Sequence, residues 1–563
     1  MNPTEHRAEA DGMTERLSFT AVWAIILLLG LVYLLLGIFQ PLGIYDEGLI
    51  IYGAQKVMQG QIPYRDFAAY YAPGQFYTLA GIFRLFGGSI LAERAWDTLV
   101  RFGICILTLL ISQRLVPKKA ALFAPLISLL LLAWCGNYAY PVIPAMFFSL
   151  LSILLALRFF SEPRAPLLFL AGAATGATVL FRQDIGAFAF FSIAFTLMVS
   201  PLISSQFKVA NKERARQRFD ALIRYGIGAG SLLIPVVCYF LVTVPRNDLQ
   251  ADFLRFLPVQ AKFRSLPLPP LIPSSSYLLS SWALGDIWFL FYSPLAIYLI
   301  STIGLFRSAW KAPEHAFRLG QRGRLLLTVF GLLLYLPALS RADLTHCLAP
   351  TLPACILIIL LLVDRPRQKR WPLNIDPVAV SVMLLAVSYL LFSIVLWCGH
   401  LYTCAPWKAT STLRRAHYFH LDPDMEDAVR FVQITVPEGQ EIFVGNSQHH
   451  QVFVSNVLFY FLAERDAGTR YYEFIPGIIT TAPIQQRVIA ELENNHVAYI
   501  VMCASAALSG HGNEVPPDSG ATILDDYLRG RYRRVRNFGD YSISQKKLGD
   551  DAEGGGKGIH QKP

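Results

Sequence analysis

Long apolar segments separated by short polar ones dominate this sequence. Between residues 21 and 398 the apolar segments have lengths near the roughly 17–25 residues that a helix needs to cross the hydrocarbon core of a bilayer. We therefore predict an α-helical polytopic membrane protein with about eleven transmembrane helices. The expected spans cover residues 21–40, 98–115, 120–135, 142–160, 166–181, 185–203, 222–244, 285–306, 325–340, 346–363 and 377–398.

One further apolar stretch, residues 73–90, is short and is interrupted by Arg84. If it crossed the membrane, Lys118 and Lys119 would lie on the outer side, against the preference of basic loops for the cytoplasm. We therefore predict a helix that lies along the outer interface.

The pattern changes after residue 399. Strand-like EIFVG (441–445) and VAYIVMC (497–503) enclose a helical stretch around 483–495, and another helix and strand follow. This alternation predicts a small α/β domain over residues 399–548. The glycine-rich tail, residues 549–563, is expected to be disordered.

Composition and charge agree with a membrane protein. Hydrophobic residues make up 54% of the chain and charged residues 16%, against about 25% charged in soluble domains; the mean hydropathy is +0.43. The net charge of +10 lies in short basic clusters between apolar segments, without the interleaved aromatic residues of a nucleic-acid surface. The clusters cover residues 114–119, 208–224, 307–324 and 365–370.

These clusters orient the chain. With a cytoplasmic N-terminal tail (1–18), every basic cluster falls in a cytoplasmic loop. The transmembrane domain (19–398) then carries outer loops at 41–97 and 245–284, and the C-terminal domain is extracytoplasmic.

The eight cysteines show no C-x-x-C pair and no metal-ligand spacing. Cys398 and Cys404 flank the last membrane exit, where they either form a disulfide or remain free thiols.

Four segments that carry candidate chemistry fall on the predicted outer side. Charged groups at a membrane border are costly, which makes them functional candidates. The candidates are Asp46 and Glu47 in GIYDEG; Arg65, Asp66 and Tyr71 in IPYRDFAAYYAPG; Arg182 and Asp184 in FRQDIG; and Arg341, Asp343 and His346 in SRADLTH.

Each segment also has a plain structural explanation. A carboxylate pair after a helix is often a solvated turn, arginine–aspartate neighbours can be local ion pairs of little energetic value, and a single histidine need not bind a metal. Because all four segments fall on the same predicted side of the membrane, we favour a common functional site. A carboxylate can accept a proton from an attacking hydroxyl, and arginines bind phosphate with two parallel hydrogen bonds.

The first outer loop, GIYDEGLIIYGAQKVMQGQIPYRDFAAYYAPGQFYTLAGIFRLFG, resembles that of the GT-C glycosyltransferases. The most similar branch contains the protein O-mannosyltransferases and the lipid A aminoarabinose transferase. On this resemblance the catalytic acid of the family corresponds to Asp46, with Glu47 beside it. FRQDIG lies where relatives carry basic and acidic residues near the donor phosphate.

The resemblance implies a glycosyltransferase (EC 2.4 class) that moves a hexosyl or pentosyl group from a polyprenyl-phosphate-linked donor to an envelope acceptor. The acceptor would be a lipid, a polysaccharide or a protein, and the lipid phosphate would leave, stabilised by Arg182, Arg341 and His346. Asp46 would be the general base on a hydroxyl acceptor; for a phosphate acceptor it would orient the acceptor or bind a metal. The resemblance leaves a divalent metal open, and the sequence shows no clear ligand set.

Two other classes compete with this hypothesis: a transporter or flippase of lipid-linked sugar, and a non-catalytic envelope assembly protein. Transporters place ionisable residues near the membrane midplane and often contain repeats. Here the helix interiors read as nearly free of charge, and no repeat is visible. We therefore expect a transferase in the bacterial inner (plasma) membrane, with its active site outside.

Overall fold

The structure is a computed structural model. It describes residues 24–134, 136–199, 211–252, 256–263, 265–270, 291–311, 319–363, 410–452, 454–504 and 518–547, with isolated residues between 384 and 402. Several predicted features lie outside these residues: both terminal tails, most of the span 377–398, much of the second outer loop, and Cys404.

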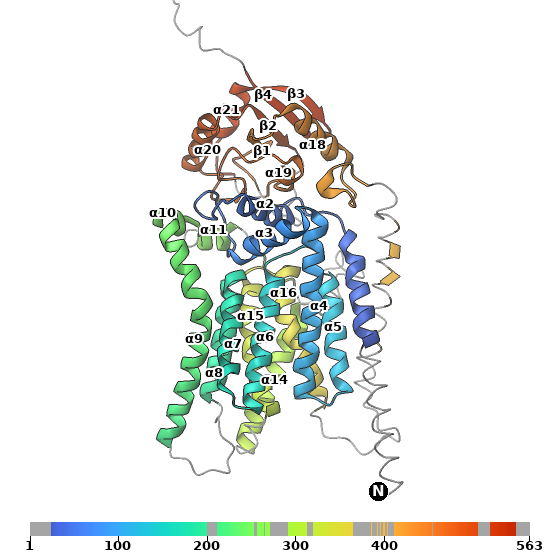
Figure 1. The fold of residues 1–563 in the computed structure, drawn as a ribbon, viewed down its shortest axis with the longest axis vertical. Coiled ribbons are helices and arrows are strands. Elements are labelled where there is room, and N and C mark those ends of the chain that lie inside the picture. The colour runs from blue at the N-terminus through green and yellow to red at the C-terminus, as the bar shows by residue number, and fades with distance from the viewer. Residues whose placement is uncertain are drawn as a thin grey trace, which may run out of the picture.

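A bundle of long helices forms the body of the molecule, and the C-terminal domain lies on one end of it (Figure 1). Five helices in the described ranges are long and apolar enough to cross a membrane, and four shorter apolar helices accompany them. The fold is thus that of a mostly helical integral membrane protein. The bundle helices are Ala24–Phe39, α4 (Ile90–Leu115), α5 (Phe123–Trp134), α6 (Val142–Ser161), α7 (Ala165–Phe181), α8 (Gln183–Val199), α9 (Asn211–Thr243), α14 (Ser293–Lys311), α15 (Leu319–Ser340) and α16 (Leu344–Val363).

Large apolar side chains cover the outer surface of the bundle. On α9, Ile234 and Val242 are 64% and 85% exposed. An apolar surface of this extent would be a liability in water, and it suits contact with lipid.

Close helix packing depends on small residues. A Cβ at Gly172 in α7 would lie 2.0 Å from the carbonyl oxygen of Tyr225 in α9, and one at Gly228 in α9 would lie 2.0 Å from that of Phe169. These glycines let the two backbones approach, as in other membrane helix pairs.

Helix α4 corrects two of our expectations. It begins at Ile90 and not near residue 98, and its interior is not free of charge, because Arg101 forms a buried ion pair with Asp97 at 2.6 Å. Arg94, one turn earlier, is buried against Glu47. A hydropathy reading counts polar residues without showing that they face inward and pair, so it began the span too late.

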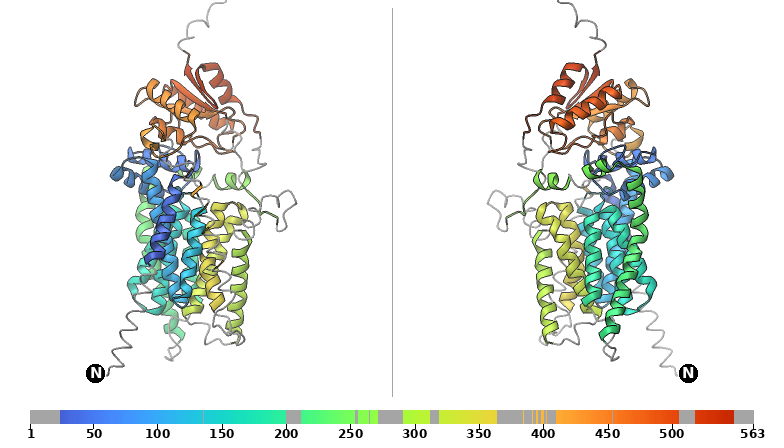
Figure 2. Two further views of the ribbon diagram at one scale, coloured as in Figure 1. Left: turned by 90° about the vertical axis from the view of Figure 1, so that its right-hand side faces the viewer. Right: turned by 90° about the vertical axis from the view of Figure 1, so that its left-hand side faces the viewer.

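Two short helices, α2 (Asp46–Met58) and α3 (Gly74–Phe86), lie between the bundle and the C-terminal domain (Figures 1 and 2). Each has 13 residues, fewer than a span requires. Residues 47–57 of α2 are all buried, and they share one apolar core with α3 and the C-terminal domain. Two further short helices, α10 (Arg246–Gln250) and α11 (Phe256–Phe263), lie at the same end of the bundle (Figure 1).

The C-terminal domain contains a four-stranded sheet of order β1-β2-β4-β3. The strands are β1 (Ile442–Asn446), β2 (Tyr499–Cys503), β3 (Tyr532–Phe538) and β4 (Tyr541–Lys546). β1 and β2 are parallel, and β4 is antiparallel to both β2 and β3. The helices are α18 (Pro423–Thr435), α19 (Leu458–Ala463), α20 (Ala482–Asn494) and α21 (Ile523–Arg531). The strands predicted at 441–445 and 497–503 correspond to β1 and β2.

Candidate active site

Side chains of all four predicted polar segments meet where the bundle joins the C-terminal domain. They surround Tyr140, which lies in the connection before α6 and feels the charges of Asp46, Arg182 and Asp343. Burial is the main cause that raises the pKa of Tyr140 to about 12; the two carboxylates raise it further, and Arg182 lowers it. Tyr71 packs edge-on against Tyr140, with ring centroids 5.9 Å apart. Predicted candidates from all four segments therefore share one site.

Asp46 is the first residue of α2. An anionic side chain in the first turn interacts favourably with the helix dipole, and the side chain is only half-buried. Burial, followed by the neighbouring Tyr140 and Asp46, raises the pKa of the Tyr71 phenol well above its ordinary value. Asp46 therefore lies beside the two tyrosines and is partly exposed.

Glu47, the other predicted catalytic carboxylate, is in a different environment. It is fully buried, and its two oxygens accept hydrogen bonds from Arg94 at 2.7 and 2.8 Å. The Gly43 N–H donates to it at 2.7 Å. Arg94 also donates to the carbonyl oxygens of Ile38 and Gln40. With these contacts Glu47 stabilises the turn between the first helix and α2.

Arg182 and Asp184 lie at the break between α7 and α8. Arg182 has an extended backbone that ends α7, and its guanidinium donates to both oxygens of Asp184 at 2.9 and 2.5 Å. Both side chains keep some exposure, at 16% and 32%. Asp184 also feels the charge of His346, which joins this segment to the next one.

Arg341, Asp343 and His346 form a compact cluster at the start of α16. Asp343 accepts a hydrogen bond from Arg341 at 2.6 Å and from the backbone N–H of His346 at 2.9 Å, which caps the helix. The Nδ1 atom of His346 lies 2.7 Å from the same carboxylate. The second loop adds a backbone bridge, since the Ala342 N–H donates to the Leu266 carbonyl at 2.8 Å.

Arg65 and Asp66, the remaining predicted substrate-binding pair, lie apart from this cluster in their described contacts. They bond to each other at 2.8 Å, and Asp66 also accepts the Ile62 N–H at 2.7 Å. The hydrogen bond from Arg65 is the main cause that lowers the pKa of Asp66. These contacts close the loop before Phe67 and do not extend toward Tyr140.

Sequence reasoning missed two residues of the site. Tyr140 lies in a connection without a motif, and Glu473 belongs to the C-terminal domain, to which we assigned no chemistry. Glu473 is 4% exposed and accepts a hydrogen bond from the Tyr45 hydroxyl at 2.8 Å. Its acidic side chain within an aromatic run, YYEF (471–474), was the only available signal.

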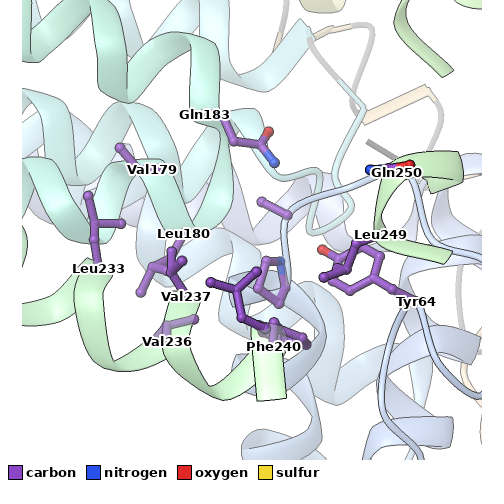
Figure 3. Close-up of a pocket in the computed structure, with 13 residues that line it drawn as sticks. Tyr64, Val179, Leu180, Gln183, Leu233, Val236, Val237, Phe240, Leu249 and Gln250 are labelled. Atoms are coloured by element: carbon purple, nitrogen blue, oxygen red, sulfur yellow. The ribbon is translucent and has the colours of Figure 1, made fainter. Parts of the chain in front are cut away.

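An apolar groove with a volume of about 300 Å³ lies next to the site. Figure 3 shows apolar side chains of α9 facing those of α7, with Gln183 and Gln250 among the few polar groups. Because Gln183 directly follows Arg182, the groove reaches the part of the chain that carries the arginine. The lining residues are Tyr64, Ala72, Pro73, Val179, Leu180, Gln183, Leu233, Val236, Val237, Phe240, Leu241, Leu249 and Gln250.

Over the described ranges, no group of three or more histidine, cysteine or acidic side chains is arranged to hold a metal. Cys398 is exposed and has a free thiol in this structure.

The fold is similar to that of ArnT from Cupriavidus metallidurans. The ArnT structure bound to undecaprenyl phosphate shares 14% sequence identity with this chain at a TM-score of 0.54, and the match covers 93% of this chain and 97% of ArnT. The apo structure of ArnT gives 13% identity, a TM-score of 0.53, and coverage of 95% and 98%. The sequence matches no protein-family model, and no curated protein is significantly similar to it. The likeness shows the fold over nearly the whole chain.

Proposed function

From the GT-C fold that this chain shares with ArnT, we propose that it is a glycosyltransferase. It moves a sugar from a polyprenyl-phosphate-linked donor to an envelope lipid, polysaccharide or protein. The reaction takes place at the outer face of the bacterial inner membrane, on which the C-terminal domain lies. The observation that carries the proposal is the meeting of Asp46, Arg182 and the Arg341–Asp343–His346 cluster around Tyr140.

The groove and the arginines suit the two ends of such a donor. An apolar groove between α7 and α9 can take up polyprenyl chain, whose transfer from water is favourable. Arg182 follows the groove-lining residues of α7, so it can meet the phosphate at the end of that chain. An ArnT structure is bound to undecaprenyl phosphate, a molecule with the same two parts.

The ion pairs of the site prepare the arginines for an anion. Asp184 and Asp343 orient Arg182 and Arg341, and both guanidinium groups are partly exposed, so a donor phosphate can approach them. Negative charge grows on the phosphate as it leaves. Cationic groups already held in place stabilise that charge without reorganisation.

Asp46 supplies the base when the acceptor is a hydroxyl. The acceptor oxygen attacks the anomeric carbon, its proton passes to the Asp46 carboxylate, and the bond from the anomeric carbon to the phosphate oxygen breaks. The lipid phosphate leaves with that electron pair. When the acceptor is a phosphate, no proton is removed, and Asp46 orients the acceptor.

The replacement Asp46→Asn tests the assignment of the base. It keeps the size of the side chain but removes the proton acceptor, and loss of a positioned base typically lowers the rate about 10²- to 10⁴-fold. We expect a folded, nearly inactive protein when purified enzyme is incubated with radiolabelled polyprenyl-phosphate sugars and an envelope extract. Asp424→Asn, in an exposed first turn of α18, is the control and should transfer sugar normally.

Two results would count against the proposal. Transfer by Asp46→Asn at more than about a tenth of the normal rate would exclude a general-base role for Asp46. Movement of labelled lipid-linked sugar across reconstituted vesicles, without transfer to any acceptor, would support a flippase instead.

A further inference from the structure

The turn that carries Asp46 is held by the C-terminal domain on one side. The backbone N–H of Leu458 donates to the Ile44 carbonyl at 3.0 Å, and the Tyr45 hydroxyl donates to Glu473 at 2.8 Å. Gly48 lies so close to Leu458 that a Cβ there would be 2.3 Å from its backbone nitrogen. The residues on both sides of Asp46 therefore contact this domain directly.

The bundle holds the same turn from the other side. Glu47 bonds to Arg94 of α4 through both carboxylate oxygens, and Gly43 closes the turn by donating to Glu47. Residues 43–48, which we call the Asp46 turn, are thus clamped between α4 and the C-terminal domain. Within this turn, the Asp46 carboxylate acts electrostatically on both Tyr71 and Tyr140.

Glu473 is a costly residue for its position. It is 4% exposed, and the hydroxyls of four tyrosines feel its charge or bond to it, namely Tyr45, Tyr70, Tyr71 and Tyr472. A buried carboxylate is expensive in folding free energy, and an apolar side chain of similar volume is often more stable in such a place. Glu473 contacts Tyr45, the residue next to Asp46. This contact suggests a functional reason for the buried carboxylate, which packing alone does not provide.

We propose that Glu473 is a positioning residue: by binding the Tyr45 hydroxyl it fixes the Asp46 turn, so that the C-terminal domain completes the active site. This role rests on the proposed transferase function. It assigns the C-terminal domain a part in the rate of the chemical step, separate from any binding of the acceptor.

Three variants of the full-length protein test the proposal: Tyr45→Phe, Glu473→Met and the double variant. Misplacement of a reacting group by about 1 Å can lower a rate about 100-fold, so each single variant should lower kcat roughly ten- to a hundred-fold while the KM for the donor changes little. The double variant should be no slower than the slower single variant, because both singles break the same contact.

The double variant also separates positioning from stability. Each single change breaks the Tyr45–Glu473 hydrogen bond and keeps one of its two buried polar groups, whereas the double change replaces both groups with apolar ones, which is nearly neutral for stability. We expect thermal stability to recover in the double variant and kcat to stay low. Recovery of kcat together with stability would show a purely structural contact and would overturn the proposal.

Tyr527→Phe is the matched control. Tyr527 donates to Glu493 at 2.6 Å in the same domain, between α21 and α20 and away from the Asp46 turn. It should leave kcat unchanged.

Hydrogen exchange of residues 43–48 gives a readout that needs no activity. Exchange there should speed up in Tyr45→Phe and Glu473→Met and remain normal in Tyr527→Phe. Unchanged exchange and a kcat within twofold of normal in both test variants would overturn the positioning role. If the wild-type protein transfers no sugar from any donor but exchange still responds, the proposed function fails and the clamp on the turn is supported.

Discussion

At the scale of single residues, two adjacent carboxylates of this protein have different environments. Asp46 is half-buried beside Tyr71 and Tyr140, whereas Glu47 is buried and bonded to Arg94. These two neighbouring carboxylates therefore differ in solvent access and in hydrogen-bond partners, and for this reason we propose a catalytic role for Asp46 and a structural role for Glu47.

The buried pair predicts how Glu47→Gln should behave. Breaking such a pair by removing one charge typically costs about 3–5 kcal/mol, because the other charge stays buried. We expect a marked fall in the melting temperature and, because Glu47 also holds the Asp46 turn, a kcat lowered roughly ten- to a hundred-fold in the fraction that remains folded. Glu162→Gln, in a pair with Arg164 that is largely exposed, should change the free energy of unfolding by less than about 0.5 kcal/mol. A Glu47→Gln protein with wild-type stability and no activity would instead make Glu47 a catalytic residue.

The site arginines should act on the donor. Arg182→Lys and Arg341→Lys keep the positive charge but lose the planar fork that binds two oxygens at once. The loss of a hydrogen bond to a charged group, about 1.5–3 kcal/mol, should raise the KM for the lipid-phosphate donor roughly tenfold or more and leave the KM for the acceptor unchanged. Arg164→Lys, in an exposed pair with Glu162, is the matched control. Normal donor kinetics in both site variants would show that these arginines only form local ion pairs.

At the scale of elements, the loops on the bundle and the C-terminal domain are joined by a polar contact around Arg470. Arg470 donates to Asp248 at 2.8 Å and to the Tyr64 carbonyl at 2.9 Å. It also contacts Asp252, which accepts the Ala69 N–H at 3.3 Å. Both outer loops therefore meet the C-terminal domain at one arginine.

This contact predicts a pH dependence. Burial raises the pKa of Asp252 from 3.8 to about 7, although Arg470 lowers it. Between about pH 4 and 7 the folded protein keeps this proton and the unfolded chain has lost it, so the contribution of Asp252 to stability falls as the pH rises through this window. Asp252→Asn removes the titration, and we expect the difference in melting temperature between pH 5 and pH 8 to change toward greater relative stability at pH 8.

Asp248→Asn is the control for this experiment. It changes another contact of the same arginine and leaves the Asp252 carboxyl, with its raised pKa, in place. Equal pH dependence of the wild type and Asp252→Asn would exclude the buried carboxyl as a titrating group.

At the scale of the whole molecule, one end of the bundle carries everything we assign to function. The polar segments, the groove, the short helices α2 and α3 and the C-terminal domain gather there (Figure 1). The connection between α6 and α7, around Pro163, lies at the other end (Figure 1), since α6 runs away from Tyr140. A lipid-linked donor can reach such a site by diffusion within the membrane.

This arrangement makes sidedness testable. In a cysteine-free variant, single cysteines at Gly60 and Gln440 should react with an impermeant thiol reagent added to intact cells, because both positions are exposed at the end that carries the C-terminal domain. A cysteine at Pro163, exposed at the opposite end, should react only after the cells are opened. Labelling of the cysteine at position 163 in intact cells would indicate the opposite orientation, with the site in the cytoplasm.

The sequence by itself determined the class of the protein and the approximate position of its elements. Apolar length and strand alternation are local properties, so spans such as 142–160 and strands such as 497–503 could be predicted from neighbouring residues alone. The polar segments around Asp46, Arg182 and Arg341 could also be found, because charge at the edge of an apolar span is visible in one dimension.

The tertiary structure decided which partners each polar residue has and how deeply it is buried. Only long-range contacts show that Glu47 is neutralised by Arg94, that α4 extends to Ile90 because its charges face inward, and that α2 lies in a core shared with the C-terminal domain. Glu473 is separated from Tyr45 by 428 positions. Burial and pairing depend on such distant partners, and no local pattern records them.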